Sequence, residues 1–321
     1  MAVTYVETRV NGKNFQVPAA EIEGRTVIVR GRWFKIASVR DEEVTEGELV
    51  RNPEAFVRDL RKSGLQADIL TFCQRPPEVK PKFPYPVELE NYAVIPITTF
   101  EAWWESLPQE ARKNTRRAAK RGVVIKVVPF DDELARGIHK LCNESPVRNG
   151  RRFWHYGKDF ETVKREHATF SDRSEFIGAY FGDELIGFIK IVYVDRLASI
   201  MHILALNAHQ DKRPMNALVA KAVEVCAQKP VGWFVYGNYF YGNKKDDSLA
   251  EFKRRNGFER LDVPRYYLPL TWKGRLFTRL KLYRGAVGLL PWPVLRPLLK
   301  IRKSLLQADR KSVMAQEVFL L

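Results

Sequence analysis

One stretch of the chain, residues 174–270, limits the fold more than any other, because strand-like and helix-like segments alternate in it around clear breaks. Residues 176–181 and 185–194 are apolar and rich in β-forming side chains, and Gly182 and Asp183 between them predict a tight turn. Residues 198–206 predict a third strand. The stretch therefore opens with three antiparallel strands.

A helix is predicted after the polar segment 207–213. Pro214 suits its first position, where the missing amide has no helical partner and the fixed backbone angle is already helical. Apolar residues then repeat at helical spacing. Residues 232–236 predict a fourth strand and residues 248–256 a short helix, which Gly257 ends as a left-handed cap before a last strand-like segment.

This order of elements resembles the core of the GNAT acyltransferase superfamily, and within it the Fem-type aminoacyl and acyl transferases and their bacterial relatives. The matching motifs are the hairpin GDELIGFIKI, the segment DKRPMNAL before a helix, and SLAEFKRRNGF. The last is similar to the xxFYxxxGF end of many GNAT domains, with Lys253 in place of tyrosine, as in Fem-type enzymes. The resemblance covers roughly residues 100–270. It implies an α+β fold with a mixed sheet.

Three parts are expected along the chain. Residues 1–90 form a β-rich N-terminal region that ends in a proline-dense connector, residues 74–90, and whether this region is a degenerate GNAT half stays open. Residues 91–271 form the GNAT-like domain. Residues 272–321 form a basic, amphipathic helical tail.

Within the N-terminal region, residues 3–10 predict a strand, and Asn11 and Gly12 predict a hairpin turn after it. Residues 25–39 contain two further β runs, and residues 53–64 a helix that begins at a proline and ends at a glycine.

The charge balance indicates anionic partners. Lysine and arginine number 54 against 38 acidic residues, which gives a net charge of +16. A predicted helix that ends at Gly122 concentrates this charge in two neighbouring rows, namely Arg112, Arg116, Lys120 and Lys113, Arg117, Arg121. An anionic donor or acceptor, including tRNA, is a candidate partner, and a merely solvated basic face is the alternative.

The tail has its own pattern. Residues 263–308 contain no acidic side chain, and lysines and arginines alternate with aliphatic residues and tryptophan. This favours a segment that lies on an anionic membrane surface, and the alternative is a helical pair packed on the domain. We find no spanning segment or signal peptide, so the expected location is the cytoplasm, with peripheral contact to the inner membrane as an open alternative. The three cysteines predict neither a disulfide framework nor a metal site.

The GNAT resemblance implies a donor site between the third core strand and the next helix, where coenzyme A rests its pyrophosphate on backbone amides. The glycine-rich signature of that loop is absent here. Charged and amide side chains are the candidates for donor binding: Lys212, Arg213, Asn216 and Asn238. Fem-type proteins are similar in lacking the signature, since their donor is an aminoacyl-tRNA. The donor is therefore acyl-CoA or aminoacyl-tRNA, with no metal.

Acyl transfer needs groups that move a proton and stabilise an oxyanion. The catalytic candidates are Lys253, Tyr236, Tyr239, Tyr241 and His202. Lys253 is interpreted as an electrostatic stabiliser or, alternatively, as an exposed lysine. His202 is interpreted as a base or as a hydrogen-bonded strand histidine.

A polar loop carries the substrate-binding candidates Arg148, Arg151, His155 and Tyr156. Arginines among aromatic residues suit the recognition of phosphate or carboxylate groups. The alternative is a surface loop whose aromatic side chains fill the core.

The sequence thus predicts an enzyme that transfers an acyl or aminoacyl group to an amine. Two alternatives stay open: an ordinary acetyl-CoA-dependent N-acetyltransferase, and an inactive GNAT-like module that binds nucleic acid or membrane through its basic faces.

Overall fold

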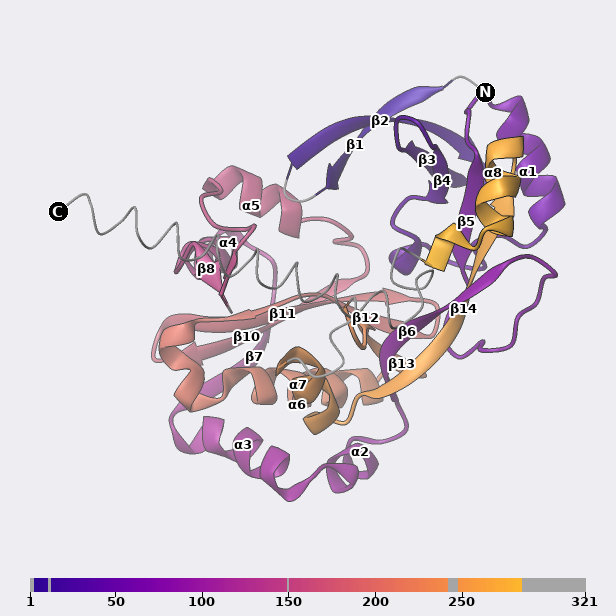
Figure 1. Ribbon diagram of the computed structural model, residues 1–321. Coiled ribbons are helices and arrows are strands. Elements are labelled where there is room, and N and C mark those ends of the chain that lie inside the picture. Colours follow the sequence, from indigo (N-terminus) through magenta and orange to yellow (C-terminus); the bar gives the residue numbers. More distant parts are fainter. Residues whose placement is uncertain (1–2, 11–12, 149, 242–247, 285–321) are drawn as a thin grey trace, which may run out of the picture.

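The computed structural model describes residues 3–10, 13–148, 150–241 and 248–284, which include one large mixed sheet with helices on both faces (Figure 1). The first strands are β1 (Thr4–Val10), β2 (Lys13–Ile22), β3 (Arg25–Arg30), β4 (Ile36–Val39) and β5 (Ile69–Cys73). The later ones are β6 (Val87–Pro96), β7 (Val123–Val128), β10 (Ser174–Phe181), β11 (Glu184–Val194), β12 (Leu197–Ala205), β13 (Trp233–Asn238) and β14 (Glu259–Pro269). Their order in the sheet is β1-β2-β3-β4-β5-β14-β6-β13-β12-β11-β10-β7.

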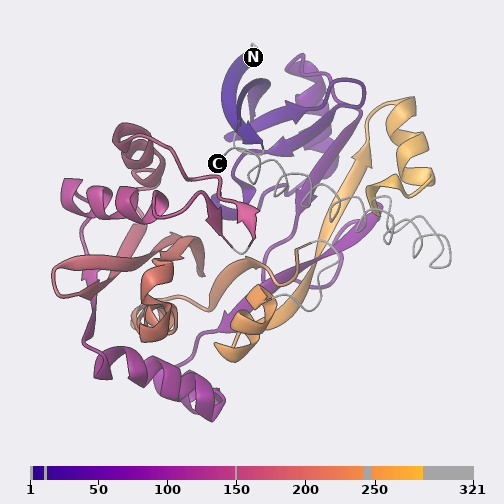
Figure 2. The same cartoon turned by 60° about the vertical axis from the view of Figure 1, so that its left-hand side comes forward.

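The helices lie in two layers over the β10–β12 part of the sheet. One layer holds α4 (Asp132–Cys142) and α5 (Phe160–His167), and the other holds α2 (Phe100–Ser106), α3 (Gln109–Lys120), α6 (Pro214–Ala227) and α7 (Ser248–Arg255) (Figures 1 and 2). A short hairpin, β8 (Val147–Arg148) and β9 (Arg151–Arg152), joins α4 to α5. The N-terminal part adds η1 (Glu42–Val44) and α1 (Pro53–Lys62).

The predicted core elements are confirmed in this region. Strands β10, β11 and β12 are antiparallel neighbours, and Gly182 makes the turn between the first two with a φ of 58°. Helix α6 begins at Pro214, as its sequence predicts, and its apolar side chains pack on the sheet. Gly257 has a φ of 79° after α7, which only a residue without a Cβ adopts readily.

Strand β14 joins the two parts of the chain. It pairs antiparallel with β5 on one side and with β6 on the other, so the sheet runs unbroken from the N-terminal strands to β10–β13. Tyr266 of β14 is fully buried, and its hydroxyl group donates to Gln74 and accepts from the amide of Lys82 at 2.6 Å. These bonds hold the proline-rich segment against the sheet. The division of the chain into domains stays a prediction.

Two sequence predictions need correction, and a third concerns residues that the structure does not describe. The connector predicted for residues 74–90 is wrong over its last four residues, because β6 begins at Val87, directly after the last proline. The segment predicted as a loop at 207–213 is largely a 3-10 helix, η2 (Asn207–Lys212). The turn at Asn11 and Gly12 lies outside the described residues.

The tail begins with α8 (Trp272–Arg279) and η3 (Leu282–Arg284), and its remainder lies outside the described residues. Helix α8 packs closely on the N-terminal part, since a Cβ at Gly274 would lie 2.0 Å from the carbonyl oxygen of Asp68. Across residues 3–284, apart from the undescribed gaps, we find no helix with the length and apolarity needed to cross a bilayer.

Candidate functional site

The sheet opens between β12 and β13. These strands are parallel and pair over three residues only, from Leu197 opposite Trp233 to Ser199 opposite Val235. Strand β12 then continues along β11, whereas β13 shifts register and pairs Asn238 with Tyr92 of β6. We call the resulting opening, between residues 200–205 of β12 and 236–238 of β13, the β12–β13 gap. It lies at the carboxyl ends of two parallel strands, where open α/β sheets bind ligands.

The divergence has a local cause in the chain. Gly237 has a φ of 51°, and a Cβ there would lie 2.6 Å from the hydroxyl oxygen of Tyr241. Beyond it, the amides of Tyr239 and Phe240 donate to the backbone oxygen and to Oδ1 of Asn91, both at 2.6 Å. Asn91 on β6 therefore pulls the end of β13 away from β12 and keeps the gap open.

Lys253 lies beside the end of β13. Its side chain is fully buried, and its Nζ donates to the carbonyl oxygen of Asn238 at 2.6 Å. The amine also lies 4.4 Å from the ring centre of Tyr236 and 4.9 Å from that of Tyr241. The alternative that Lys253 is an exposed lysine is therefore wrong. Its neighbours Arg254 and Arg255 are the exposed cations of that run, and both pair with Glu251.

The three tyrosines differ in position. Burial raises the pKa of Tyr236, and Tyr241 adds to the shift, so Tyr236 keeps its proton at neutral pH. Burial also raises the pKa of Tyr239, whose ring contacts Phe240. Tyr241 is the exposed one of the three. All three lie at or just after the end of β13, and whether any of them moves a proton stays a prediction.

His202 lies on β12 in a cluster of histidines. Its ring centre is 4.5 Å from that of His167 on α5 and 6.2 Å from that of His155. Burial, and after it the charges of His167 and His155, hold the pKa of His202 well below its usual 6.5. His202 is therefore neutral at pH 7, burial disfavours its protonated form, and a role as a base stays a prediction. No group of three metal-ligating side chains is found in the described parts of the chain.

Lys190 of β11 pairs across the sheet with His202. It is fully buried, and its Nζ donates to the carbonyl oxygens of His167, at 2.8 Å, and Thr169, and to Oγ1 of Thr169 at 3.1 Å. Burial lowers its pKa to about 8. The sequence reasoning missed both Lys190 and His167, because a lone polar residue within an apolar strand or at a helix end carries no sign of its partner.

The predicted donor loop has few free amides. The amide of Ala208 donates to Oε1 of Glu144 at 3.1 Å, that of His209 to the Leu206 carbonyl oxygen, and that of Arg213 to the Gln210 carbonyl oxygen. Pro214 has no amide to offer. A carboxylate thus occupies part of the place where a pyrophosphate is expected.

The four donor-binding candidates do not converge. Lys212 pairs with Asp211 at 3.5 Å and lies 4.7 Å from the ring centre of Phe181, at the far end of β10. Arg213 is exposed, with a left-handed backbone. Asn216 donates from Nδ2 to Oδ1 of Asn256 at 3.0 Å and so connects α6 to α7. Only Asn238, through its carbonyl oxygen, contacts Lys253 at the gap.

The substrate-loop candidates also separate. Arg148 is a connector: Nη1 donates to the Ala205 carbonyl oxygen at 2.8 Å, and Nη2 to the Leu141 carbonyl oxygen and to Glu144. The side chain of Arg151 lies outside the described residues. His155 accepts from Nζ of Lys158 at Nδ1, 3.0 Å away, and faces His202, whereas Tyr156 is exposed. His155 is thus the candidate of this loop that the structure brings to a catalytic candidate.

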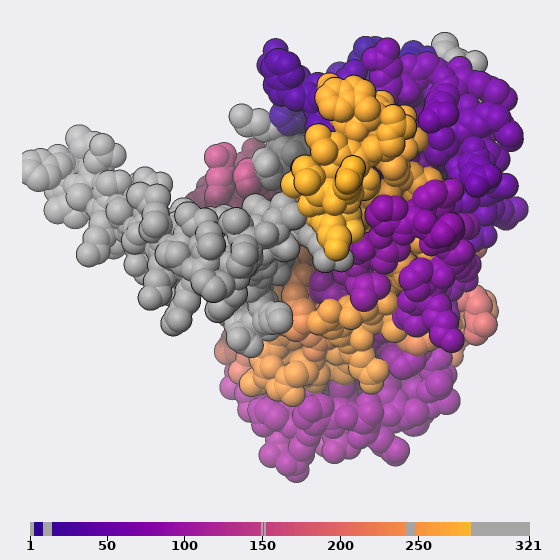
Figure 3. Space-filling model, turned by 45° about the vertical axis from the view of Figure 1, so that its right-hand side comes forward, coloured from indigo at the N-terminus to yellow at the C-terminus, as the bar shows by residue number. Residues whose placement is uncertain are grey.

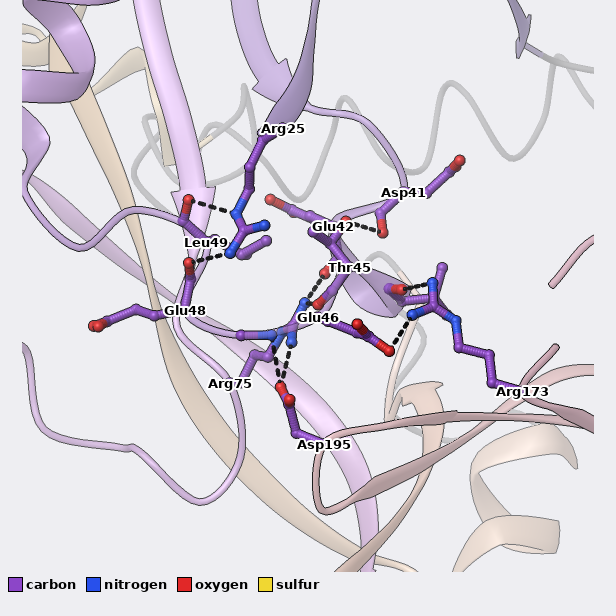
Figure 4. A network of polar contacts seen from close by, with 12 residues as sticks. Arg25, Asp41, Glu42, Thr45, Glu46, Glu48, Leu49, Arg75, Arg173 and Asp195 are labelled. Atoms are coloured by element: carbon purple, nitrogen blue, oxygen red, sulfur yellow. Dashed lines mark hydrogen bonds and ion pairs between the residues drawn. The ribbon is translucent and has the colours of Figure 1, made fainter. Parts of the chain in front are cut away.

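A cavity of about 590 Å³ lies at the start of β12 and β13, on the side of the N-terminal region. Apolar side chains such as Leu49, Phe83 and Trp233 line it together with Arg75. Figure 4 shows how Arg75 holds its wall, through an ion pair with Asp195 at 3.4 Å and bonds to the carbonyl oxygens of Glu42 and Thr45. A smaller hollow shares part of this lining and reaches Ile200 and Gly237, where the gap begins.

No protein-family model matches the chain, and no curated protein matches it. Among solved structures, FemX is similar over 87% of this chain and 90% of its own, at 10% identity and a TM-score of 0.55. L-PGS from Bacillus licheniformis is similar over 82% and 88%, at 14% identity and a TM-score of 0.51. The C-terminal domain of a putative lysylphosphatidylglycerol synthetase from Agrobacterium fabrum is similar over 80% and 85%, at 15% identity and a TM-score of 0.50.

At these identities the likeness shows a shared fold. The chain therefore has the GNAT-like fold that its sequence resembles, in the form found in FemX. The likeness to FemX extends beyond residues 100–270 and takes in part of the N-terminal region.

Proposed function

We propose that this protein is an N-acyltransferase that moves an acyl or aminoacyl group onto an amine at the β12–β13 gap. The observation that carries the proposal is the divergence of the two parallel strands after three paired residues. The divergence leaves the β12 edge from Ile200 onward without a strand opposite it among the described residues. Backbone amides on such an edge are fixed donors for a carbonyl oxygen that becomes negative during transfer.

We assign the chemistry to two side chains, Lys253 beside the end of β13 and His202 of β12, whose ring lies on the α5 side of the sheet. The amine attacks the donor carbonyl carbon, a C–N bond forms, and the bond to the leaving oxygen or sulfur breaks. Neutral His202 takes the proton that the amine loses and returns it to the leaving group. Lys253, held by the Asn238 carbonyl oxygen, provides positive charge near the oxyanion.

Two observations favour an aminoacyl ester, as in aminoacyl-tRNA, over acyl-CoA as donor. The amides before α6 are bonded within η2 or to Glu144, so a pyrophosphate has few donors there. The outer side of α3 exposes Lys113, Arg116 and Lys120, which suit a polyanion larger than coenzyme A. Acyl-CoA remains the second candidate donor.

The acceptor side is inferred from the cavities. The smaller hollow reaches the gap at Ile200 and Gly237 and adjoins the cavity of about 590 Å³. We infer that the amine reaches the donor carbonyl from this side.

The test is a donor assay with the full-length protein. Acetyl-CoA and a mixture of aminoacyl-tRNAs are each added with a panel of primary amines, and free thiol or acid-soluble labelled amino acid is measured. We expect transfer from aminoacyl-tRNA, and a higher melting temperature in its presence, because a ligand that binds only the native state stabilises it. Transfer from acetyl-CoA alone would identify the ordinary N-acetyltransferase. If neither donor supports transfer or raises the melting temperature, the inactive binding module is the interpretation that remains.

A matched pair of variants locates the chemistry. His202→Asn should lower the transfer rate about 10²–10⁴-fold, the usual contribution of a general base. His139→Asn, which changes a histidine of α4 that lies 3.1 Å from the Lys158 carbonyl oxygen, should leave the rate within a factor of about two. Equal effects of the two substitutions would place the chemistry elsewhere.

A further inference from the structure

A second surface of the molecule carries several large apolar side chains that are exposed to solvent. Trp33, in the turn between β3 and β4, is 83% exposed, and Trp272, at the start of α8, is 64% exposed. Leu276 on α8 and Leu280 directly after it are exposed as well. Large side chains of this kind are usually covered, and neighbouring exposed ones mark a contact surface.

These residues come from opposite ends of the chain, and specific contacts hold them together. The rings of Phe34 and Phe277 stack with their centres 4.5 Å apart. The Asp68 carboxylate accepts from the amide of Lys35 at 2.9 Å and from the hydroxyl group of Thr271 at 2.7 Å. The turn and α8 are therefore fixed beside each other. Figure 3 shows α8 in yellow on the surface, against the N-terminal part of the chain.

The charges on this surface have one sign. Its exposed members, which we name the Trp33–α8 surface, are Arg32, Trp33, Trp272, Lys273, Arg275, Leu276, Arg279 and Leu280. Residues 30–35 and α8 contain no acidic residue, and in the described structure no ion pair joins these cations to a carboxylate. Asp68, the acid between them, is engaged by Lys35 and Thr271 as described.

We propose that the Trp33–α8 surface docks on the surface of an anionic lipid bilayer. Tryptophan prefers the headgroup region of a bilayer, because its ring is apolar and its N–H group is polar. Leu276 and Leu280 enter the acyl boundary beside it, and the surrounding cations bind anionic headgroups. The proposal is independent of the acyl-transfer reaction, since none of these residues lines the β12–β13 gap.

The aliphatic residues favour a bilayer over a nucleic acid as the partner. Nucleic acid offers phosphates and base faces, which use cations and aromatic rings, but nothing that covers exposed leucines. The outer side of α3 is the contrasting case, with exposed Lys113, Arg116 and Lys120 and no exposed leucine.

The test is flotation of the full-length protein with vesicles. We expect the protein to float with vesicles that contain phosphatidylglycerol in phosphatidylcholine, and to stay in solution with vesicles of phosphatidylcholine alone. The double variant Trp33→Ala, Trp272→Ala should reduce the bound fraction about tenfold. Trp154→Ala, which removes an exposed tryptophan in the loop after β9, should not reduce it.

Charge reversal distinguishes binding through the Trp33–α8 surface from binding through the overall positive charge of the protein. Lys273→Glu with Arg275→Glu should abolish flotation, whereas Lys113→Glu with Lys120→Glu on α3 makes the same change in net charge and should preserve it. Because all four side chains are exposed, an unchanged melting temperature confirms that each variant folds. Equal losses in both pairs, or binding of tRNA but not of vesicles through the Trp33–α8 surface, would overturn the proposal.

Discussion

Two fully buried lysines lie in the same sheet region but in different surroundings. Lys190 donates to oxygens of His167 and Thr169 on the α5 side, and these bonds connect α5 and the segment after it to β11. Lys253 donates to the Asn238 carbonyl oxygen at the β12–β13 gap and lies over the rings of Tyr236 and Tyr241. Burial alone therefore does not distinguish the two lysines, whereas the position of the amine relative to an opening in the sheet does.

The comparison predicts that changing lysine to methionine affects the transfer rate differently at the two positions. Lys253→Met should lower the transfer rate about 10²–10³-fold, because it removes the charge that we propose stabilises the oxyanion. Lys190→Met should lower the rate per folded molecule less than Lys253→Met does, because its amine does not reach the gap and can act only through His202, which lies opposite it in the sheet. The measurement is initial rate with the donor that proves active, normalised to folded protein by circular dichroism. Equal losses of transfer rate in the two variants would contradict the proposed difference between Lys253 and Lys190.

The second prediction concerns stability and pH. The pKa of Lys190 is lowered to about 8 in the folded protein, whereas the unfolded chain keeps the ordinary value near 10.5. Between these values the unfolded chain holds the proton and the folded protein does not, so raising the pH stabilises the fold. Relative to Lys190→Met, the wild type should gain about 3 kcal/mol from pH 8 to pH 10.5. Urea unfolding of both proteins at each pH measures this difference, and parallel pH dependences would contradict the prediction.

A smaller effect is expected where Lys190 loses one acceptor. Thr169→Val removes the 3.1 Å bond to Oγ1 and should lower the free energy of unfolding by about 1 kcal/mol. Transfer activity should not change. Ser171→Ala, an exposed neighbour, serves as the control in urea unfolding. A loss of activity with Thr169→Val would connect the Lys190 site to the chemistry.

The smallest effect is expected at Tyr236. Tyr236→Phe keeps the ring under Lys253, so the rate should fall less than about threefold, because the attraction between cation and ring remains. A loss of 10²-fold or more would instead show that the hydroxyl group moves a proton, as the sequence reasoning also allowed. Rates at several pH values distinguish these outcomes.

The fold was predictable where local chemistry decides it. Gly182 and Asp183 fix the β10–β11 turn, Pro214 begins α6, and Gly257 ends α7. The start of β6 was missed, because proline density hides the first strand residues after Pro86. The 3-10 helix at Asn207–Lys212 was missed because short polar segments have no periodicity.

The site was predictable only in part, because its residues meet through tertiary contacts. His155, His167 and His202 come from a loop, a helix and a strand, and only two of them carried a sequence signal. Arg148 illustrates the opposite error, since its charge suggested a ligand but its guanidinium group connects backbone carbonyls and Glu144. Asn91 was undetectable, because its role depends on a strand almost 150 residues later.

The place of β14 has a consequence for synthesis on the ribosome. Among the described strands of the sheet it is the last to be translated, yet it lies between β5 and β6. Until residue 269 has left the exit tunnel, both of those strands present an unpaired edge on the nascent chain. A pause in translation before this point leaves two unpaired strand edges exposed, which can pair with other chains. The protein should therefore depend on chaperones more than its size suggests.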